Sequence, residues 1–280
     1  MLLAFIKFII CSILIVAISK NILASTLRKL AEGINLKSKI VGSIAGIATS
    51  VPEFLSVGIA GFTGLIDTGI FNILSSNVIN VIEYTITIFI NKNTTNLKNK
   101  AIIIELILTL ITVIIPIVMF VKNIELNIKI VVIFFIMFII FNIIDTQSHK
   151  KYFKAENKEK SKNAENTKKA SKKEIIKYII ILIISAILLF IIGNILSNSL
   201  EILCNKFGIS QIIIGILLGI ITSAPEFITF NEAQKYHKKE NREKIQGVIE
   251  ATNNLISSNM LNLFIIQSVG IIIYLLINNH

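Results

Sequence analysis

The sequence contains only two cysteines, three histidines and three prolines among its 280 residues. The two cysteines, Cys11 in an apolar run and Cys204 in a short loop, cannot form a disulfide framework. No His-Glu-x-x-His motif occurs in the chain, so the helical zinc site of many metalloproteases is excluded. These absences argue against a disulfide scaffold and against the commonest metal-dependent hydrolases.

Acidic residues are also few, because 17 Asp and Glu face 28 Lys and Arg and the formal net charge is +11. Such a charge invites a nucleic-acid interpretation. However, the basic residues lie in segments between apolar runs and are not combined with a set of base-stacking aromatic residues, as nucleic-acid sites require. We therefore expect no nucleic-acid partner.

Apolar residues dominate the chain, with 54% hydrophobic residues and a mean hydropathy of +0.77. Several runs rich in Leu, Ile, Phe and Val are about 20 residues long, the length of a membrane-spanning helix. A membrane β-barrel would show alternating strands of about 10 residues instead. The sequence predicts an all-α, polytopic membrane helix bundle in a lipid bilayer. We expect eight spans, at residues 1 to 19, 38 to 64, 68 to 91, 101 to 121, 125 to 145, 174 to 197, 208 to 234 and 246 to 277.

Residues 146 to 173 contain ten lysines and three glutamates, which cannot bury enough apolar surface to fold alone. They predict a disordered linker between a first half, residues 1 to 145, and a second half, residues 174 to 280. If the N-terminus lies outside, 23 of the 28 Lys and Arg residues lie in cytoplasmic segments. The positive-inside rule then predicts a multi-pass cell-membrane protein with a cytoplasmic linker and both termini outside.

Two motifs occur twice. Gly42 to Phe54 reads GSIAGIATSVPEF and Gly215 to Phe227 reads GILLGIITSAPEF; Asn72 to Asn80 reads NILSSNVIN and Asn254 to Asn262 reads NLISSNMLN. The predicted spans that carry the two copies run in opposite directions across the membrane. Such a pair of repeats, here at about residues 40 to 82 and 213 to 264, is an inverted-topology repeat, which is typical of secondary transporters with a site at the midplane.

Each first motif places a glutamate, Glu53 or Glu226, within a membrane span. A charged side chain at that depth costs several kcal/mol, so an intramembrane acid indicates a functional site. Pro52 and Pro225 precede these glutamates and free the backbone carbonyl four residues earlier in each helix. Because inverted repeats place equivalent residues on opposite sides of a two-fold axis, we expect the two glutamates to face each other near the membrane centre.

Hydroxyl and amide residues lie at helical spacing around these glutamates. Carboxylate, hydroxyl, amide and backbone oxygens, without sulfur or imidazole, are the ligands of hard cations such as Ca²⁺ or Na⁺. Two ionised glutamates would balance the charge of one divalent ion. The side chains expected to gather are Thr49, Glu53, Ser76 and Asn80 from the first repeat and Thr222, Glu226, Ser258 and Asn262 from the second.

The doubled Thr-Ser-x-Pro-Glu and Ser-Asn-x-x-Asn segments resemble the α-repeats of the sodium/calcium exchanger family, within the cation/calcium antiporter superfamily. The resemblance implies ion ligands at the eight side chains above, and at the backbone carbonyls of Gly46 and Gly219. It also implies a transporter rather than an enzyme, with Ca²⁺ and Na⁺ as transported ions and no resident cofactor.

The chain departs from the family pattern in two ways. Glycines that usually precede the Thr-Ser pair are replaced by Ala48 and Ile221. The family usually has ten spans, and here the last two are absent from the second half. We therefore expect the polar residues of the span at 246 to 277 to be covered by the protein's own bundle, by a second copy in a homodimer, or by a partner.

The favoured function is a Ca²⁺/Na⁺ antiporter that works by alternating access. The alternatives are an antiporter coupled to protons or specific for another divalent ion, an intramembrane enzyme that uses the glutamate pair, and an inactive shortened exchanger. Glu83, three residues after Asn80, has no acidic twin in the second repeat. It is either part of an inner ion path or a paired or water-facing acid.

Overall fold

The computed structural model describes residues 2–34, 36–62, 64–152, 170–208, 210–239 and 244–278. These residues form helices, joined by short turns, and contain no β-strand. The helices are α1 (Leu2–Ile18), η1 (Ser19–Ala24), α2 (Ser25–Gly33), α3 (Ser38–Thr49), α4 (Val51–Phe62), α5 (Ile66–Ile90), η2 (Thr94–Lys98), α6 (Lys100–Val121), α7 (Ile128–Tyr152), α9 (Lys172–Phe207), α10 (Gln211–Thr222), α11 (Ala224–Lys239), α12 (Lys244–Met260), η4 (Leu261–Ile266) and α13 (Gln267–Asn278).

Seven helical segments of the described chain are long and apolar enough to cross a membrane, and they correspond to the second to eighth predicted spans. The first predicted span corresponds to α1, whose apolar stretch Leu3–Ile15 is shorter than the other seven. The all-α polytopic bundle is thus confirmed.

One predicted span boundary was wrong: α7 continues to Tyr152 and its membrane-crossing segment to Lys151, beyond the predicted end at 145. Helix α9 continues to Phe207, but its membrane-crossing segment, Lys172–Leu196, agrees with the predicted span at 174 to 197. In both cases polar and charged residues extend a helix past its apolar part, which hydropathy alone does not detect. The predicted linker at 146 to 173 is shortened by these helices, and its residues 153–169 lie outside the described part of the chain.

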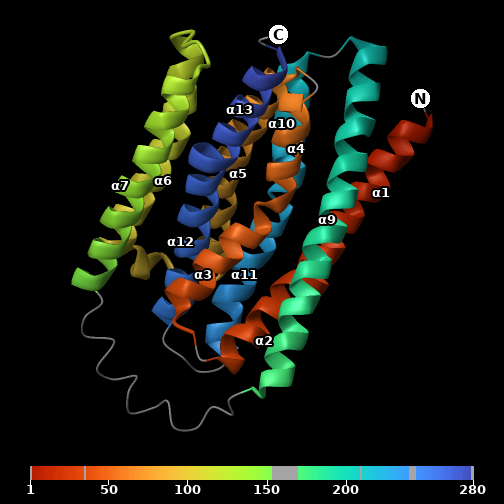
Figure 1. Cartoon of the computed structure of the whole chain (residues 1–280). Helices are drawn as coiled ribbons and strands as arrows, with labels where there is room; N and C mark the ends of the chain where they lie inside the picture. The colour runs from red at the N-terminus through yellow and green to blue at the C-terminus, as the bar shows by residue number, and fades with distance from the viewer. Residues whose placement is uncertain are drawn as a thin grey trace.

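The second and seventh predicted spans are each broken in the middle. Helix α3 ends at Thr49 and α4 begins at Val51; α10 ends at Thr222 and α11 begins at Ala224. Each break lies just before a proline, which has no N–H to donate to the preceding turn. The broken helices run in opposite directions through the bundle (Figure 1). The inverted repeat that the sequence predicts is therefore present in the fold.

The repeats form the centre of the molecule. Helices α6 and α7 stand on one side of α3, α4, α5 and α10 to α13, and α1 and α9 stand together on the other side (Figure 1). The start of α1 and the end of α13 lie at the same end of the bundle. We call the opposite end, where α7 ends and α9 begins, the linker end.

Each broken helix packs against the other repeat, α3 on α12 and α10 on α5. Glycines allow the close approach: a methyl group added at Gly46 would lie 2.6 Å from the carbonyl oxygen of Asn254, and one at Gly219 would lie 2.6 Å from that of Asn72. These two contacts are equivalent in the two repeats. The repeats therefore interlock, and neither site segment is held by its own repeat alone.

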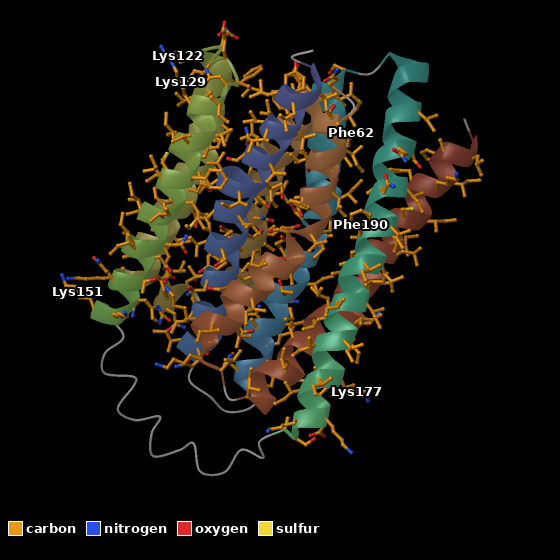
Figure 2. All side chains as sticks on the ribbon, in the orientation of Figure 1. Phe62, Lys122, Lys129, Lys151, Lys177 and Phe190 are labelled. Carbon is orange, nitrogen blue, oxygen red and sulfur yellow. The ribbon has the colours of Figure 1, made fainter. Side chains whose placement is uncertain are left out.

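Apolar side chains cover the outside of the bundle, as a lipid environment requires. Phe62 and Phe190 are 69% and 49% exposed and point outward, whereas Lys122 and Lys129 lie at one end and Lys151 and Lys177 at the linker end (Figure 2). Polar residues are instead concentrated in the interior. The molecule is thus apolar outside and polar at its centre.

Helices α6 and α7 cover α12 and η4. Helices α3 and α11 pack against α12 as well, and of its polar residues Asn253, Asn254 and Ser258 are buried within the chain itself, whereas Ser257 is half-buried. Of the three expected ways of covering the last span, the protein's own bundle is the one found for these residues. A homodimer or partner at this surface remains a prediction.

Candidate ion-binding site

The eight side chains that the sequence assigns to the site lie together at the two helix breaks and on the helices packed against them. All are fully buried, with 0% of each residue exposed; they are Thr49, Glu53, Ser76, Asn80, Thr222, Glu226, Ser258 and Asn262. Among the described residues, no group of three or more His, Cys, Asp and Glu side chains could hold a metal ion. An ion at this centre would therefore depend on hydroxyl and amide oxygens beside the carboxylates.

Glu53 is held by residues of both repeats. The Ser76 hydroxyl donates to Oε1 of Glu53 at 2.9 Å and also lies 2.8 Å from the Ser223 hydroxyl. Ser223 in turn donates to the carbonyl oxygen of Gly219 at 2.7 Å. Thr222 lies beside Glu53, while its hydroxyl donates to the carbonyl oxygen of Leu218 at 3.0 Å. A carboxylate of the first repeat is therefore bound to the helix break of the second.

Glu226 has the equivalent surroundings. The Ser258 hydroxyl donates to its Oε1 at 2.9 Å and lies 2.9 Å from the hydroxyl of Ser50, which donates to the Gly46 carbonyl oxygen at 2.9 Å. Thr49 is the neighbouring threonine here. The two halves of the site are thus related residue by residue.

Asn77 and Asn259 link the two repeats. Asn77 Nδ2 donates to the carbonyl oxygen of Asn259 at 3.2 Å, and Asn259 Nδ2 donates to that of Asn77 at 3.1 Å. Their side-chain oxygens accept from Asn80 Nδ2 at 2.9 Å and from Asn262 Nδ2 at 3.2 Å. The reciprocal pair fixes the orientation of Asn80 and Asn262, the two asparagines predicted to be ligands.

Asn77 and Asn259, together with Ser50 and Ser223, were not among the predicted ligands. The signal that could have found them was available, because all four belong to the duplicated motifs. Reasoning from ligand chemistry selected one serine and one asparagine per motif, and it overlooked the residues that position them.

The predicted backbone ligands have other contacts in this structure. The Gly46 carbonyl accepts from Ser50 N at 3.2 Å, Ser50 Oγ at 2.9 Å and Thr49 Oγ1 at 3.3 Å. The Gly219 carbonyl accepts from the corresponding groups of Ser223 and Thr222. Their role as ion ligands stays a prediction, and binding would require the hydroxyl groups to turn away.

Four buried oxygens of the site have no hydrogen-bond donor in the described chain: Oε2 of Glu53 and Glu226, and Oδ1 of Asn80 and Asn262. They form two equivalent pairs. A buried polar atom without a partner costs about 1–3 kcal/mol and calls for an explanation. Four such oxygens in one polar centre are suited to accept a cation.

The two glutamates are connected through this network. Asn262 Nδ2 donates to Ser76 Oγ at 3.5 Å and Asn80 Nδ2 donates to Ser258 Oγ at 3.4 Å, so each asparagine reaches the serine that binds a glutamate. Glu226 also lies within electrostatic range of Glu53. Their expected face-to-face arrangement at the centre agrees with these contacts, while the distance between the carboxylates stays a prediction.

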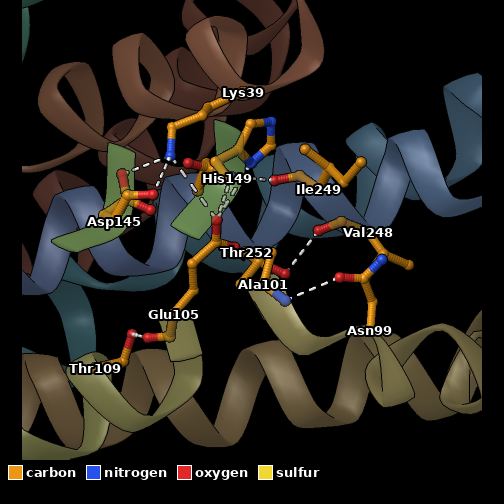
Figure 3. A network of polar contacts seen from close by, with 11 residues as sticks. Lys39, Asn99, Ala101, Glu105, Thr109, Asp145, His149, Val248, Ile249 and Thr252 are labelled. Atoms are coloured by element: carbon orange, nitrogen blue, oxygen red, sulfur yellow. Dashed lines mark hydrogen bonds and ion pairs between the residues drawn. The ribbon is translucent and has the colours of Figure 1, made fainter. Parts of the chain in front are cut away.

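A second buried polar cluster lies at the linker end of α3. Lys39 Nζ forms an ion pair with Asp145 and lies 3.9 Å from Oε1 of Glu105, and His149 Nδ1 lies 3.5 Å from the same oxygen (Figure 3). The cluster joins α3 to α6 and α7. It anchors the first broken helix, and no pattern in the sequence indicates that these residues meet.

The chain was compared with known proteins. Residues 4–147 and 177–280 match the family described as sodium/calcium exchanger protein. No curated protein sequence matches the chain.

Two kinds of solved structure share the fold. One is the sodium-calcium exchanger NCX_Mj, with a TM-score of 0.60 and 16% identity over 98% of this chain and 84% of that chain. Another is the H⁺/Ca²⁺ exchanger CAX, with a TM-score of 0.64 and 15% identity over 98% of this chain and 68% of that chain. At such low identity these structures support the fold alone. The match of the family over nearly the whole length, together with the inverted repeat and its buried oxygen centre, shows that the chain belongs to the sodium/calcium exchanger protein family.

Proposed function

We propose that this protein is a secondary active antiporter that exchanges Ca²⁺ for Na⁺ at the buried centre between its two repeats. The observation that carries the proposal is the set of four buried oxygens without a donor, on Glu53, Glu226, Asn80 and Asn262. Two carboxylate and two amide oxygens are typical ligands of Ca²⁺ and Na⁺.

The charge of the centre supports exchange. No described basic side chain forms an ion pair with Glu53 or Glu226, so their two negative charges depend on cations for compensation. One Ca²⁺ or two Na⁺ would supply the same charge. The two ions would therefore compete for one set of ligands, which is the physical basis of antiport.

The fold supports alternating access. The glutamates lie at breaks of two helices that enter the bundle from opposite ends, and inverted repeats allow one half to move relative to the other around a central site. From the distribution of basic residues, we propose that the linker end faces the cytoplasm and that both termini lie outside.

Uptake of ⁴⁵Ca²⁺ into proteoliposomes that hold purified protein tests the proposal. An outward Na⁺ gradient should drive uptake, and collapse of the gradient should stop it. Liposomes without protein and liposomes with a Glu53→Gln, Glu226→Gln double variant provide the controls. Uptake by the double variant at the wild-type rate would contradict the proposed site.

Proton coupling is the second candidate, because the fold resembles the H⁺/Ca²⁺ exchanger CAX as well as NCX_Mj. The same liposomes with an imposed proton gradient, and no Na⁺ on either side, distinguish the two. Uptake driven by the proton gradient alone would replace Na⁺ by H⁺ in the proposal. Uptake driven by the Na⁺ gradient alone would support Na⁺ coupling.

A further inference from the structure

Glu83 is a membrane-embedded acid that the proposed site does not use. It follows Ser76 and Asn80 on α5 at intervals of four and three residues, so the three side chains lie on one face of the helix. At a rise of about 1.5 Å per residue, Glu83 is about 4.5 Å further along the axis than Asn80. It thus extends the row of predicted ligands by one turn toward the linker end.

The surroundings of Glu83 connect it to the site. Its carboxyl group lies beside the backbone N–H of Phe227, which belongs to the first turn of α11 next to Glu226 and donates to the carbonyl oxygen of Ser223. It lies within electrostatic range of both Glu53 and Glu226. Its Oε2 is buried and has no hydrogen-bond donor, and the same is true of Oε2 of the fully buried Glu53. Two carboxylates near each other therefore each have an oxygen free for a cation.

No described basic side chain forms an ion pair with Glu83. Lys39, the lysine on α3, is already paired with Asp145 and Glu105. A carboxylate at this depth requires a counter-charge. The passing ion can provide it.

We propose that Glu83 is an additional cation ligand on the linker side of the central site, where it holds Ca²⁺ or Na⁺ as the ion moves between Glu53 and the water at that end. The inference rests on the proposed transport function and extends it to a third carboxylate. Ca²⁺ commonly binds several carboxylates at once, which makes such a stepwise transfer feasible.

The second repeat has no acid at this position, although the buried amide of Gln267, two residues further along, also lacks a hydrogen-bond partner among the described residues. The residue equivalent to Glu83, three positions after Asn262, is Ile265 on η4. Because η4 leads toward the opposite end of the bundle, the approach from that end has an apolar residue where the linker side has an acid. The effect of Glu83 must therefore differ between the two sides of the membrane.

The test measures the Ca²⁺ concentration that half-saturates transport from each side, in vesicles sorted by the accessibility of a C-terminal affinity tag. Glu83→Gln keeps the shape of the side chain but removes its charge. It should raise the half-saturating Ca²⁺ concentration at the linker side by about tenfold and change the value at the opposite side by less than about twofold. Glu232→Gln, at an exposed acid on α11, is the matched control and should change neither value.

Unchanged values on both sides, or equal changes on both sides, would overturn the role of Glu83 while the proposed transport function stands. Absence of Ca²⁺ transport by the wild-type protein would overturn both. If Glu83→Gln is not recovered as a monodisperse protein, the half-saturating Ca²⁺ concentrations on the two sides are measured for Glu83→Asp instead, and unchanged or equally changed values again overturn the role of Glu83. Glu83→Asp keeps the charge but withdraws the carboxylate by one carbon, so we expect a smaller rise at the linker side alone.

Discussion

The two repeats are nearly identical where they meet and different where they face outward. At the centre, Ser76 donates to Glu53 and Ser258 donates to Glu226, both at 2.9 Å. On the outer face, Ile256, Met260 and Phe264 are at most 3% exposed because α6 and α7 cover them. Their equivalents on α5 include Ile82, which is 47% exposed.

This difference between the centre and the outer faces reflects two structural requirements, one for binding an ion and one for facing lipid. An ion needs oxygens at fixed positions on both sides, and a single geometry repeated about a two-fold axis supplies them. The outer faces only need to be apolar, since lipid and apolar helices serve equally well as neighbours. The linker-end cluster around Lys39 also has no twin, because the equivalent residue on α10 is Ile212. Symmetry is thus confined to the site.

The largest effect should come from the two glutamates and should be the same for both. Glu53→Gln and Glu226→Gln each remove one of two charges that compensate a divalent ion, so we expect initial Ca²⁺ uptake to fall on the order of 100-fold. Uptake into proteoliposomes at matched protein content measures this. Glu125→Gln, in the exposed turn between α6 and α7, is the control. Strongly unequal losses would show that the halves are not equivalent in function.

The next largest effect should be confined to one repeat. Lys39→Met leaves the buried carboxylates of Glu105 and Asp145 without their ammonium group, and breaking a buried pair in this way costs about 3 kcal/mol or more. We expect the variant to unfold at a lower temperature than the wild type. The measurement is the temperature at which heating abolishes the monodisperse size-exclusion peak of the detergent-solubilised protein. The exposed Lys98→Met provides the comparison. Stability equal to that of the wild type would mean that the cluster does not anchor α3.

Glycine substitutions should again affect both repeats, with the larger effect at Gly219, where the added methyl group would also meet the Ser75 hydroxyl. A methyl group at Gly46 or Gly219 would lie 2.6 Å from a backbone carbonyl oxygen of the other repeat, so each alanine variant should lose about 1–3 kcal/mol. The same thermal assay measures the loss. Gly58→Ala is the control, since no atom lies within 4 Å of the added methyl group. If the control is as unstable as the variants, the close approach of the repeats is not the cause.

The smallest effect concerns the asparagine pair. Asn77→Ala and Asn259→Ala each remove one of two reciprocal hydrogen bonds and the side-chain oxygen that accepts from Asn262 or Asn80, and such bonds between membrane helices are worth about 1 kcal/mol each. Because the two residues share contacts, the double variant should lose less stability than the sum of the single losses. Asn77→Ala combined with the exposed Asn142→Ala should be additive. Additivity in both cases would contradict a direct link between the repeats.

Much of this fold could be predicted from the sequence, because a lipid environment restricts the possible secondary structure and because helical spacing shows which residues share a face. Apolar runs of about 20 residues require helices in a membrane, and basic segments between them indicate which end faces the cytoplasm. A proline and a glutamate that recur in matched surroundings indicate a broken helix and an ion site. That the eight side chains gather at one buried centre could be predicted because helical spacing places them on the faces that also carry the glutamates, and their role as ion ligands stays a prediction.

Other features depend on contacts between distant segments, and no local pattern shows them. The sequence did not reveal that α3 packs on α12 rather than on its own repeat, because a small glycine fits many neighbours. Nor did it reveal that Asn77 and Asn259 pair with each other, or that Lys39 meets Asp145 and Glu105. Helix periodicity defines which residues share a face, whereas only tertiary packing decides which two faces meet and which buried oxygens are left to bind an ion.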